Sequence, residues 1–230
     1  MAMAKSDLVG LYRRRSRRYD LTANLYYLIG FREHAFRRRA VAALDLHRGD
    51  TVVEIGCGTG LNFKLLRDAV GSQGRVVGID LTEAMLDKAR RRVARHGWSN
   101  VEFVHADADQ FELPDDACAV ISTFALTLMP RYDDIIRRSA DALPPGGRMA
   151  VLDFKGPEGW PHWLVRLGVT ITSPFGVTAD LMARKPWESM KRWFADVHMK
   201  ELFWGSAYIC VGAAGGGPPD DAPSDEEESR

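Results

Sequence analysis

The sequence lacks several features that would place it in a specialised class of protein. Its 230 residues contain only three cysteines, Cys57, Cys118 and Cys210, and these are far apart and have no metal-ligand spacing. We therefore expect no disulfide framework and no bound metal, and a reducing, cytoplasmic location. No run of about 18 apolar residues is present to span a membrane, and the first residues contain no apolar core of signal-peptide length.

A net charge is also absent, because 31 Lys and Arg residues balance 31 Asp and Glu residues. The distribution is uneven, however. Residues 1–50 contain eleven basic and five acidic residues, whereas residues 215–230 contain six acidic residues and one Arg. With 46% hydrophobic residues, the chain is able to bury one sizeable core. We predict a single domain over residues 1–212 and a disordered acidic tail over 213–230, where little is available to bury.

Short apolar runs alternate with segments that have helical periodicity. The runs are rich in Val and Ile, which is typical of strands buried on both faces of a parallel sheet. Predicted strands are 50–55, 74–79, 100–105, 117–124 and 147–154, and the predicted helices between them are 61–70, 83–97 and 132–143. This alternation predicts an α/β fold with a doubly wound, mainly parallel sheet.

The two ends of the domain depart from this alternation. Basic helical segments at about 7–18 and 31–45 precede the first strand and predict an N-terminal helical cap over 1–48. "HMKELFW" and "SAYICV", separated by Gly205, predict a final pair of strands and a total of seven. Before them, residues 155–197 form a predicted substrate-cap region, because most of the tryptophans lie in or beside this segment.

The stretch "VVEIGCGTGLN" places three glycines, Gly56, Gly58 and Gly60, between a strand and a helix. Such a turn allows backbone N–H groups and a helix N-terminus to approach a ligand closely. The loop alone does not identify that ligand, because enzymes that bind dinucleotides use a similar one.

Four neighbouring residues narrow the choice of ligand. The dinucleotide pattern has Gly or Ala where this chain has Leu61, and Glu54 would repel a pyrophosphate but suits a ligand with positive charge. Asp80 ends the second strand, at the position that bonds ribose hydroxyls, and Asp107 follows the third strand. An adenosine with a free ribose and a cationic amino-acid arm fits all four, as in S-adenosylmethionine.

In order and spacing, "VVEIGCGTG", "VVGIDLTEAM", "HADADQF" and "LPPGGRMAVLDF" resemble the class I S-adenosylmethionine-dependent methyltransferases. The resemblance covers about residues 12–212 and implies their Rossmann-like fold and their cofactor. It implies that the arm lies against Glu54 and the glycine loop, that Asp80 binds the ribose, and that Asp107 accepts from the adenine amine. The implied cofactor-binding residues are Tyr19, Glu54, Gly56, Cys57, Gly58, Gly60, Asp80, Leu81, Met85, Asp107, Ala108 and Thr123.

The finer resemblance is to ubiquinone/menaquinone C-methyltransferases and to phospholipid N-methyltransferases, through "YDLTANLYYLIGFREHAFRRRAV". "STFALTLMPRYDD" and "GSAYICVG" depart from the quinone group. We therefore expect methyl transfer to a small apolar or amphiphilic acceptor, such as a quinone precursor. The alternatives are a phospholipid or amine N-methyltransferase at a membrane surface, and a non-catalytic S-adenosylmethionine-binding protein.

Other partners are argued for or against by single features. "STFALT" lacks the motif of methyltransferases that act on nucleic-acid bases, so no nucleic acid is expected, although "YRRRSRRYD" is basic. The same basic segment allows a peripheral membrane contact with anionic lipid. A catalytic base is needed only if the acceptor must lose a proton, and no residue is assigned that role. Side chains of the right type are His34, His162, Tyr26, Tyr27 and Asp153.

Overall fold

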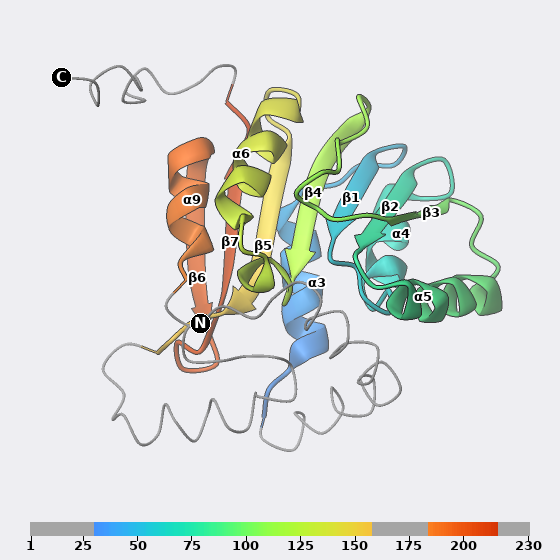
Figure 1. The fold of residues 1–230 in the computed structure, drawn as a ribbon, viewed down its shortest axis with the longest axis horizontal. Helices are drawn as coiled ribbons and strands as arrows, with labels where there is room; N and C mark the ends of the chain where they lie inside the picture. Colours follow the sequence, from blue (N-terminus) through green and yellow to red (C-terminus); the bar gives the residue numbers. More distant parts are fainter. Residues whose placement is uncertain (1–29, 158–183, 216–230) are drawn as a thin grey trace.

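The computed structural model describes residues 30–157 and 184–215. In this part of the chain, seven strands form one sheet in the order β3-β2-β1-β4-β5-β7-β6 (Figure 1). The strands are β1 (Thr51–Ile55), β2 (Arg75–Asp80), β3 (Val101–His105), β4 (Ala117–Thr123), β5 (Arg148–Phe154), β6 (Ala195–Leu202) and β7 (Ala207–Ala213). Strand β7 pairs antiparallel with β5 and β6, and the other pairs are parallel. The predicted fold class is therefore confirmed.

Helices cover both faces of this sheet. They are α3 (Glu33–Ala43), α4 (Phe63–Val70), α5 (Glu83–His96), α6 (Tyr132–Ala142) and α9 (Pro186–Trp193), with a 3-10 turn η2 at Leu126–Leu128. One core contains residues of α3, α4 and α5, and the other contains residues of α6, η2 and α9. Alternate strand residues divide between the two cores: Val52 faces the first, and Val53 and Ile55 face the second.

The predicted element boundaries agree with the structure to within one or two residues for the central strands and helices. Gly97 ends α5 in the left-handed conformation, with φ of 64°. The predicted final hairpin is present as β6 and β7. Strand β7 includes Ala213, and Ala214 is buried, so the ordered chain extends past the predicted start of the tail. Residues 7–18 and most of the predicted substrate cap lie outside the described residues.

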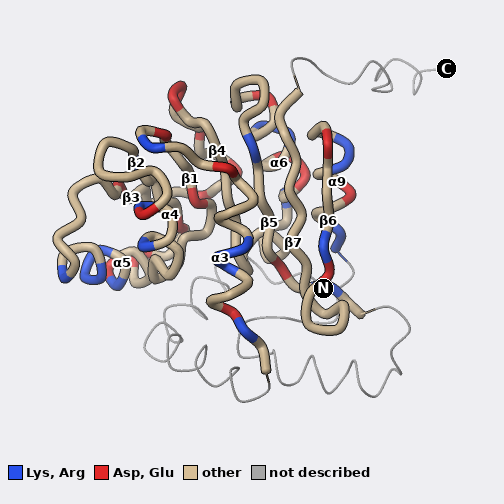
Figure 2. Tube along the Cα trace, turned by 180° about the vertical axis from the view of Figure 1, so that it is seen from behind, with Lys and Arg blue, Asp and Glu red and all other residues tan. Residues whose placement is uncertain are grey.

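Helix α5 has a basic outer face. Its buried side is formed by Met85, Leu86, Ala89 and Val93. Figure 2 shows the Lys and Arg positions of this helix along the opposite, outer edge of the molecule. The helix is thus amphipathic, and packing of its apolar side against β2 and β3 explains why so many like charges are tolerated on the other.

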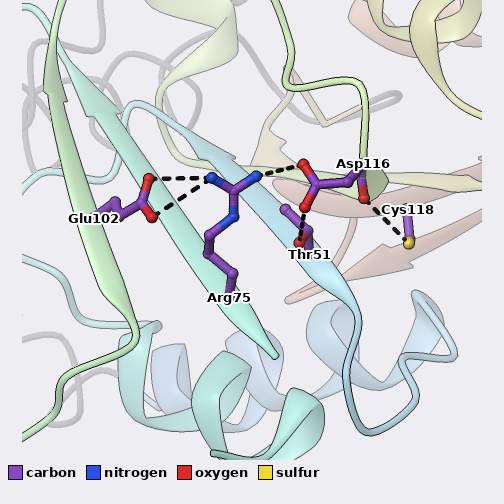
Figure 3. A network of polar contacts seen from close by, with 5 residues as sticks. All are labelled: Thr51, Arg75, Glu102, Asp116 and Cys118. Carbon is purple, nitrogen blue, oxygen red and sulfur yellow. Dashed lines mark hydrogen bonds and ion pairs between the residues drawn. The ribbon is translucent and has the colours of Figure 1, made fainter. Parts of the chain in front are cut away.

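An exposed polar network ties together the amino ends of four strands (Figure 3). The Arg75 guanidinium at the start of β2 contacts Glu102 of β3 at 3.3 Å and also pairs with Asp116, just before β4. Thr51 at the start of β1 donates a hydrogen bond to Asp116 at 2.8 Å. This bond, followed by the Arg75 charge, lowers the pKa of Asp116. The network fixes the edge of the sheet opposite the site described below.

Candidate cofactor and acceptor site

A cavity lies at the carboxyl ends of β1, β2 and β4, where open parallel sheets usually bind ligands. Its walls come from the segments that follow β1, β2, β3 and β4, together with Arg37 of α3. Nine of the twelve predicted cofactor-binding residues line it: Gly56, Cys57, Gly58, Asp80, Leu81, Met85, Asp107, Ala108 and Thr123. Segments distant in sequence therefore meet at one cavity, as the motif spacing predicts.

The glycine loop forms one wall because its backbone adopts conformations that few other residues tolerate. Gly56 has φ of 70°, and a Cβ atom there would collide with the side chain of Ala125, beyond the end of β4. Gly60 has φ of 74°, and a Cβ atom there would lie 2.5 Å from the Phe63 ring at the start of α4. These glycines keep the loop against both neighbours and leave the cavity open above it.

Asp80 connects the loop to the end of β2. Its Oδ2 accepts a hydrogen bond from the Gly58 N–H, and its Oδ1 accepts one from the Thr82 N–H, both at 2.8 Å. Burial raises the pKa of Asp80, and these two bonds act in the opposite direction. The Thr82 hydroxyl also bonds to this carboxylate. A carboxylate has about four acceptor positions, so the geometry still suits a ligand that presents a hydroxyl.

The segment after β3 forms the far side of the cavity. Asp107, Ala108 and Asp109 all line it, and Asp107 Oδ1 accepts the Asp109 N–H at 3.1 Å. From the opposite side, Arg138 of α6 donates to the Ala108 carbonyl at 2.7 Å. The segment is thus held in place from two directions, and it places the acidic side chain of Asp107 beside the cavity.

Glu54 does not line the cavity but lies beneath it. In the β1 alternation, Glu54 shares a face with Val52, so its side chain points toward α3 and α4. It is 1% exposed; Oε1 accepts from Asn62 Nδ2 at 2.6 Å, and Oε2 is buried without a hydrogen-bond partner among the described residues. Burial raises its pKa to about 8, against the Arg37 charge and the Asn62 bond. At pH 7 the group is therefore mainly neutral.

Arg37 is a cavity residue that sequence analysis did not identify. It belongs to α3, is 5% exposed and lines the cavity beside Thr123 and Phe124. Its Nη1 donates to Thr123 Oγ1 at 2.5 Å and to Asn62 Oδ1 at 3.3 Å. Helical spacing was the available signal, because Arg37 falls on the same face as Phe36, Ala40 and Val41.

An apolar wall completes the cavity after β4. It consists of Phe124, Ala125, Leu128, Met129 and Pro130. Phe124 has φ of 55°, which is unusual for a residue with a side chain, and its ring packs 4.8 Å from that of Phe154. The wall lies next to Thr123, one of the predicted cofactor-binding residues, and gives that side of the cavity an apolar character.

Buried contacts fix the backbone of this wall. Asp153, at the end of β5, accepts the Thr127 N–H at Oδ2, 2.9 Å away. Arg184 donates to the carbonyls of Thr127 at 2.8 Å and Met129 at 3.2 Å. Burial raises the pKa of Asp153 to about 6. Asp153 does not line the cavity. Its hydrogen bond from the Thr127 N–H holds the wall in position.

The remaining predicted residues are placed elsewhere. Gly60 lies under the loop and does not line the cavity, and Tyr19 is outside the described residues. Of the candidate bases, His34 is exposed on α3 and does not line the cavity, whereas Tyr26, Tyr27 and His162 are outside the described part. Among described residues, no group of three or more His, Cys, Asp or Glu is arranged to hold a metal.

Comparison with known proteins finds similarity to methyltransferases. Residues 52–147 match the family model described as "Methyltransferase domain". Demethylmenaquinone methyltransferase of Listeria monocytogenes is 29% identical over 137 residues, 58% of each chain. The ubiquinone/menaquinone biosynthesis C-methyltransferase of Pseudomonas fluorescens is 37% identical over 143 residues, 61% of this chain and 55% of the relative. The chain thus spans less than two thirds of the length of these curated relatives.

Solved structures show the same fold at low sequence identity. The putative methyltransferase of Haloferax volcanii, solved with the Trm112 activator, has a TM-score of 0.65 and 19% identity, covering 87% of this chain and 97% of that one. Phosphoethanolamine N-methyltransferase 2 of Haemonchus contortus, solved with S-adenosylmethionine, has a TM-score of 0.60 and 16% identity, covering 77% and 52%.

The sheet and the helices on its two faces have the Rossmann-like fold of the class I S-adenosylmethionine-dependent methyltransferases. The part of the chain that resembles a methyltransferase domain is residues 52–147. These findings confirm the predicted fold class and agree with the predicted resemblance to S-adenosylmethionine-dependent methyltransferases. No helix among the described residues is long and apolar enough to cross a membrane.

Proposed function

We propose that the protein transfers a methyl group from S-adenosylmethionine to a small apolar or amphiphilic acceptor. The observation that carries this proposal is one cavity with two kinds of wall. Asp80, Asp107 and the glycine loop suit an adenosyl amino acid, and the Phe124–Pro130 wall suits an apolar partner beside it. When bound, the cofactor supplies an electrophilic methyl group on a sulfonium.

The residues of the chain contribute mainly by positioning. Asp80 orients the ribose, the Asp107 segment holds the adenine, and the loop from Gly56 to Gly58 leaves space for the arm. The apolar wall excludes water and holds the acceptor in line with the methyl group. Holding two reactants in such a geometry contributes up to about 7–11 kcal/mol toward lowering the barrier. As the bond to the acceptor forms, the bond from the methyl group to the sulfonium breaks and the thioether leaves. An acceptor ring carbon then also loses a proton to a base, and no residue is assigned that role.

The acceptor class is supported by the cavity and by the relatives. Four of the wall residues, Phe124, Leu128, Met129 and Pro130, are large and apolar. The curated relatives are named for methylation of demethylmenaquinone and of ubiquinone or menaquinone precursors. A quinone precursor is therefore the first acceptor to test, although the sequence after β4 departs from that of the quinone group.

The test is methyl transfer from labelled S-adenosylmethionine to three kinds of acceptor. These are a demethylated naphthoquinone with a short isoprenoid chain, supplied in its reduced hydroquinone form because only that form is nucleophilic, phosphoethanolamine, and phosphatidylethanolamine in vesicles. We expect label in the naphthoquinone, and none with an Asp80→Ala variant. Transfer only to either amine would replace the proposal with N-methylation, and cofactor binding without transfer to any acceptor in a lysate would favour a non-catalytic binding protein.

N-methylation of a lipid or amine is the second candidate. One observation favours it: a phosphoethanolamine N-methyltransferase is among the solved structures of similar fold. Peripheral contact with anionic lipid would accompany it, through the basic segment before α3 and the outer face of α5 with Arg91 and Arg95. Sedimentation with anionic vesicles at low salt tests this contact, and no sedimentation there would remove it.

A further inference from the structure

The turn between β6 and β7, residues 202–205, presents a tryptophan to solvent. Trp204 is 73% exposed, and among the described residues it is the one large hydrophobic side chain with such exposure. Single hydrophobic residues are common on protein surfaces, so exposure alone would assign no role to Trp204. The conformation of the backbone that carries it is a second and independent observation.

The backbone of this turn is strained. Phe203 and Trp204 have φ of 46° and 54°, and the Gly205 N–H donates to the Leu202 carbonyl at 3.1 Å. Turns with positive φ at both central residues strongly favour Asn and Gly, because larger side chains crowd the backbone there. Two aromatic residues in these positions therefore carry an energetic cost, and such costs are typical of segments that have a function.

Internal packing accounts for the first aromatic residue and not for the second. The Phe203 ring lies 5.2 Å from the Phe31 ring, edge to face, and is packed against the core on the α3 side of the sheet. The Trp204 ring lies 4.8 Å from Phe203, and most of its surface is left to solvent. The described interior therefore gains little from a tryptophan at this position, which indicates a partner outside it.

The turn lies at the end of the sheet where the parallel strands end and the cavity is formed. Leu202 and Ala207 pair with each other beside the turn, and Ala207 also pairs with Phe154, the last residue of β5. In Figure 1 the turn, the start of α3 and α5 all lie toward the lower side of the molecule, and Figure 2 shows Lys and Arg positions of α5 there. One flat surface approaching from that side would meet the exposed aromatic ring and these basic positions together.

The chain also brings positive charge to the turn. A Cβ atom on Gly30 would lie 4.0 Å from the Phe203 ring, so the chain joins the described structure beside the turn. Residues 1–29, which precede this point, contain six Lys and Arg and only two acidic residues. At the turn itself, Glu201 is paired with Lys155 and adds no net negative charge. An exposed ring next to a basic segment matches a lipid–water interface with anionic head groups.

We propose that Trp204 and its turn insert into the interface of an anionic membrane, so that the cavity end of the sheet faces the bilayer. Tryptophan suits that interface because its ring is apolar and its indole N–H is polar. The inference adds an apolar anchor to the basic contact considered above for N-methylation. It does not depend on which acceptor is methylated, although an apolar or amphiphilic acceptor would be supplied from the same bilayer.

The experiment measures sedimentation of the full chain with vesicles, without cofactor or acceptor. The vesicles are phosphatidylcholine with phosphatidylglycerol, and phosphatidylcholine alone, each at low and at high salt. The proteins are the wild type, Trp204→Asn, Trp204→Phe and, as a matched control, Trp98→Asn, which changes a half-buried ring that stacks on His96 before the start of β3. The melting temperature of each protein is measured alongside.

The wild type should sediment with the anionic vesicles, and less with phosphatidylcholine alone. Trp204→Asn should bind the anionic vesicles about five- to thirtyfold more weakly at both salt concentrations, because ions do not screen the burial of an apolar ring. Its melting temperature should be equal or higher, because Asn tolerates the left-handed conformation. Trp204→Phe should retain most of the binding, and Trp98→Asn should retain all of it with a lower melting temperature.

A wild type that does not sediment with anionic vesicles would overturn the inference, and so would Trp204→Asn that sediments as the wild type does. In the second case, a lowered melting temperature would mean that the ring packs on a part of this chain outside the described residues. A dimer that sedimentation velocity detects without vesicles, and that Trp204→Asn abolishes, would mean that a second copy covers the ring and would also overturn the inference.

If Trp204→Asn fails to fold, Trp204→Gly gives the same comparison, because Gly also suits the left-handed backbone. Failure of the proposed function gives a different result. A protein that sediments through Trp204 but transfers no methyl group to any acceptor would retain the membrane contact and lose only the methyl transfer.

Discussion

We call the side of the sheet where the parallel strands begin the amino edge, and the side where they end the carboxyl edge. Each contains an arginine that joins acidic and other polar side chains, but one arginine is partly exposed to solvent and the other is buried. At the amino edge, Arg75 joins Glu102 and Asp116, with side chains 32%, 56% and 60% exposed (Figure 3). At the carboxyl edge, Arg37 joins Glu33, Asn62 and Thr123, and the Arg37 and Glu33 side chains are 6% and 11% exposed.

This difference separates a buried polar network beside the cavity from a solvent-exposed one at the other end of the strands. Exposed ion pairs are worth about 0–1 kcal/mol, because water competes for both partners. Buried charged groups carry a large desolvation cost, and they often add little net stability. The carboxyl edge also contains a buried carboxylate oxygen without a partner at Glu54, whereas the amino edge has none among the described residues. Polar groups held at such a cost beside a cavity are typical of functional sites.

The largest effect should come from removing Asp80 at the carboxyl edge. Asp80→Ala loses the acceptor for the ribose and the bond that holds Gly58, so S-adenosylhomocysteine and 5′-methylthioadenosine should both bind about ten- to a hundredfold more weakly. Calorimetric titration measures this. Asp87→Ala, on the exposed side of α5, is the control and should bind as the wild type does; unchanged affinity in Asp80→Ala would mean that the cofactor lies elsewhere.

A substitution of Asp153 tests how much the buried hydrogen bond to the backbone of the apolar wall contributes to stability. Asp153→Asn replaces one acceptor of a backbone N–H with an amide donor, and should lower the free energy of unfolding at pH 7 by about 1–3 kcal/mol. Urea denaturation measures the loss. The matched change Asp134→Asn removes an exposed pair with Arg131 and should cost at most about 1 kcal/mol. An equal loss in the free energy of unfolding in both variants would contradict the expected difference between the buried contact and the exposed one.

Glu54 should give the carboxyl edge a characteristic pH dependence. Its pKa in the folded protein is raised from 4.5 to about 8, so the folded state retains a proton that the unfolded state loses. The stability that this group contributes is complete below pH 4.5 and is lost as the pH rises toward 8. Asp153, raised to about 6, acts in the same direction at lower pH.

The side chain introduced by Glu54→Gln stays neutral, so the variant does not lose folding stability at this position as the pH rises toward 8. Its melting temperature should therefore rise relative to the wild type between pH 5 and pH 9, by at least about 2–4 °C, which corresponds to about 1 kcal/mol. The wild type and the variant share the Asp153 contribution, which cancels in the difference. Parallel melting curves across this range would contradict a raised pKa at Glu54.

The smallest effect should come from the amino edge. Arg75→Ala should lower the free energy of unfolding by about 0–1 kcal/mol, less at high salt, and leave S-adenosylhomocysteine affinity unchanged. Urea denaturation at two salt concentrations and one titration measure this. A loss of ligand affinity in Arg75→Ala would show that the two edges are coupled and would break the comparison.

The sequence predicted the parts of the site that depend on local pattern. Buried strands and amphipathic helices have clear periods, and the loop glycines and Asp80 follow directly from the ends of β1 and β2. Glu54 was assigned to the amino-acid arm from its position beside the loop. Strand alternation instead directs its side chain toward α3 and α4, beneath the cavity, and period-two reasoning applied to that one residue would have indicated this.

The parts not predicted depend on tertiary contacts. Arg37 lies in a run of three arginines that resembles a solvated helix face, and its contacts with Asn62 and Thr123 are 25 and 86 residues away in sequence. The apolar wall from Phe124 to Pro130 has no periodic pattern, and its shape depends on Asp153 and Arg184. Neither the long-range contacts of Arg37 nor the contacts that shape the wall can be read from a single sequence. The one available indication is that Arg37 lies on the buried face of α3.

The central claim is that the cavity at the carboxyl edge is an adenosyl amino-acid site. The most direct measurement is calorimetric titration of the wild-type protein with S-adenosylmethionine, S-adenosylhomocysteine and NADH in parallel. We predict binding of both adenosyl ligands at a single site with micromolar dissociation constants, and none of NADH. Binding of NADH, or of none of the three, would contradict the claim and leave the likeness to methyltransferases as one of fold alone.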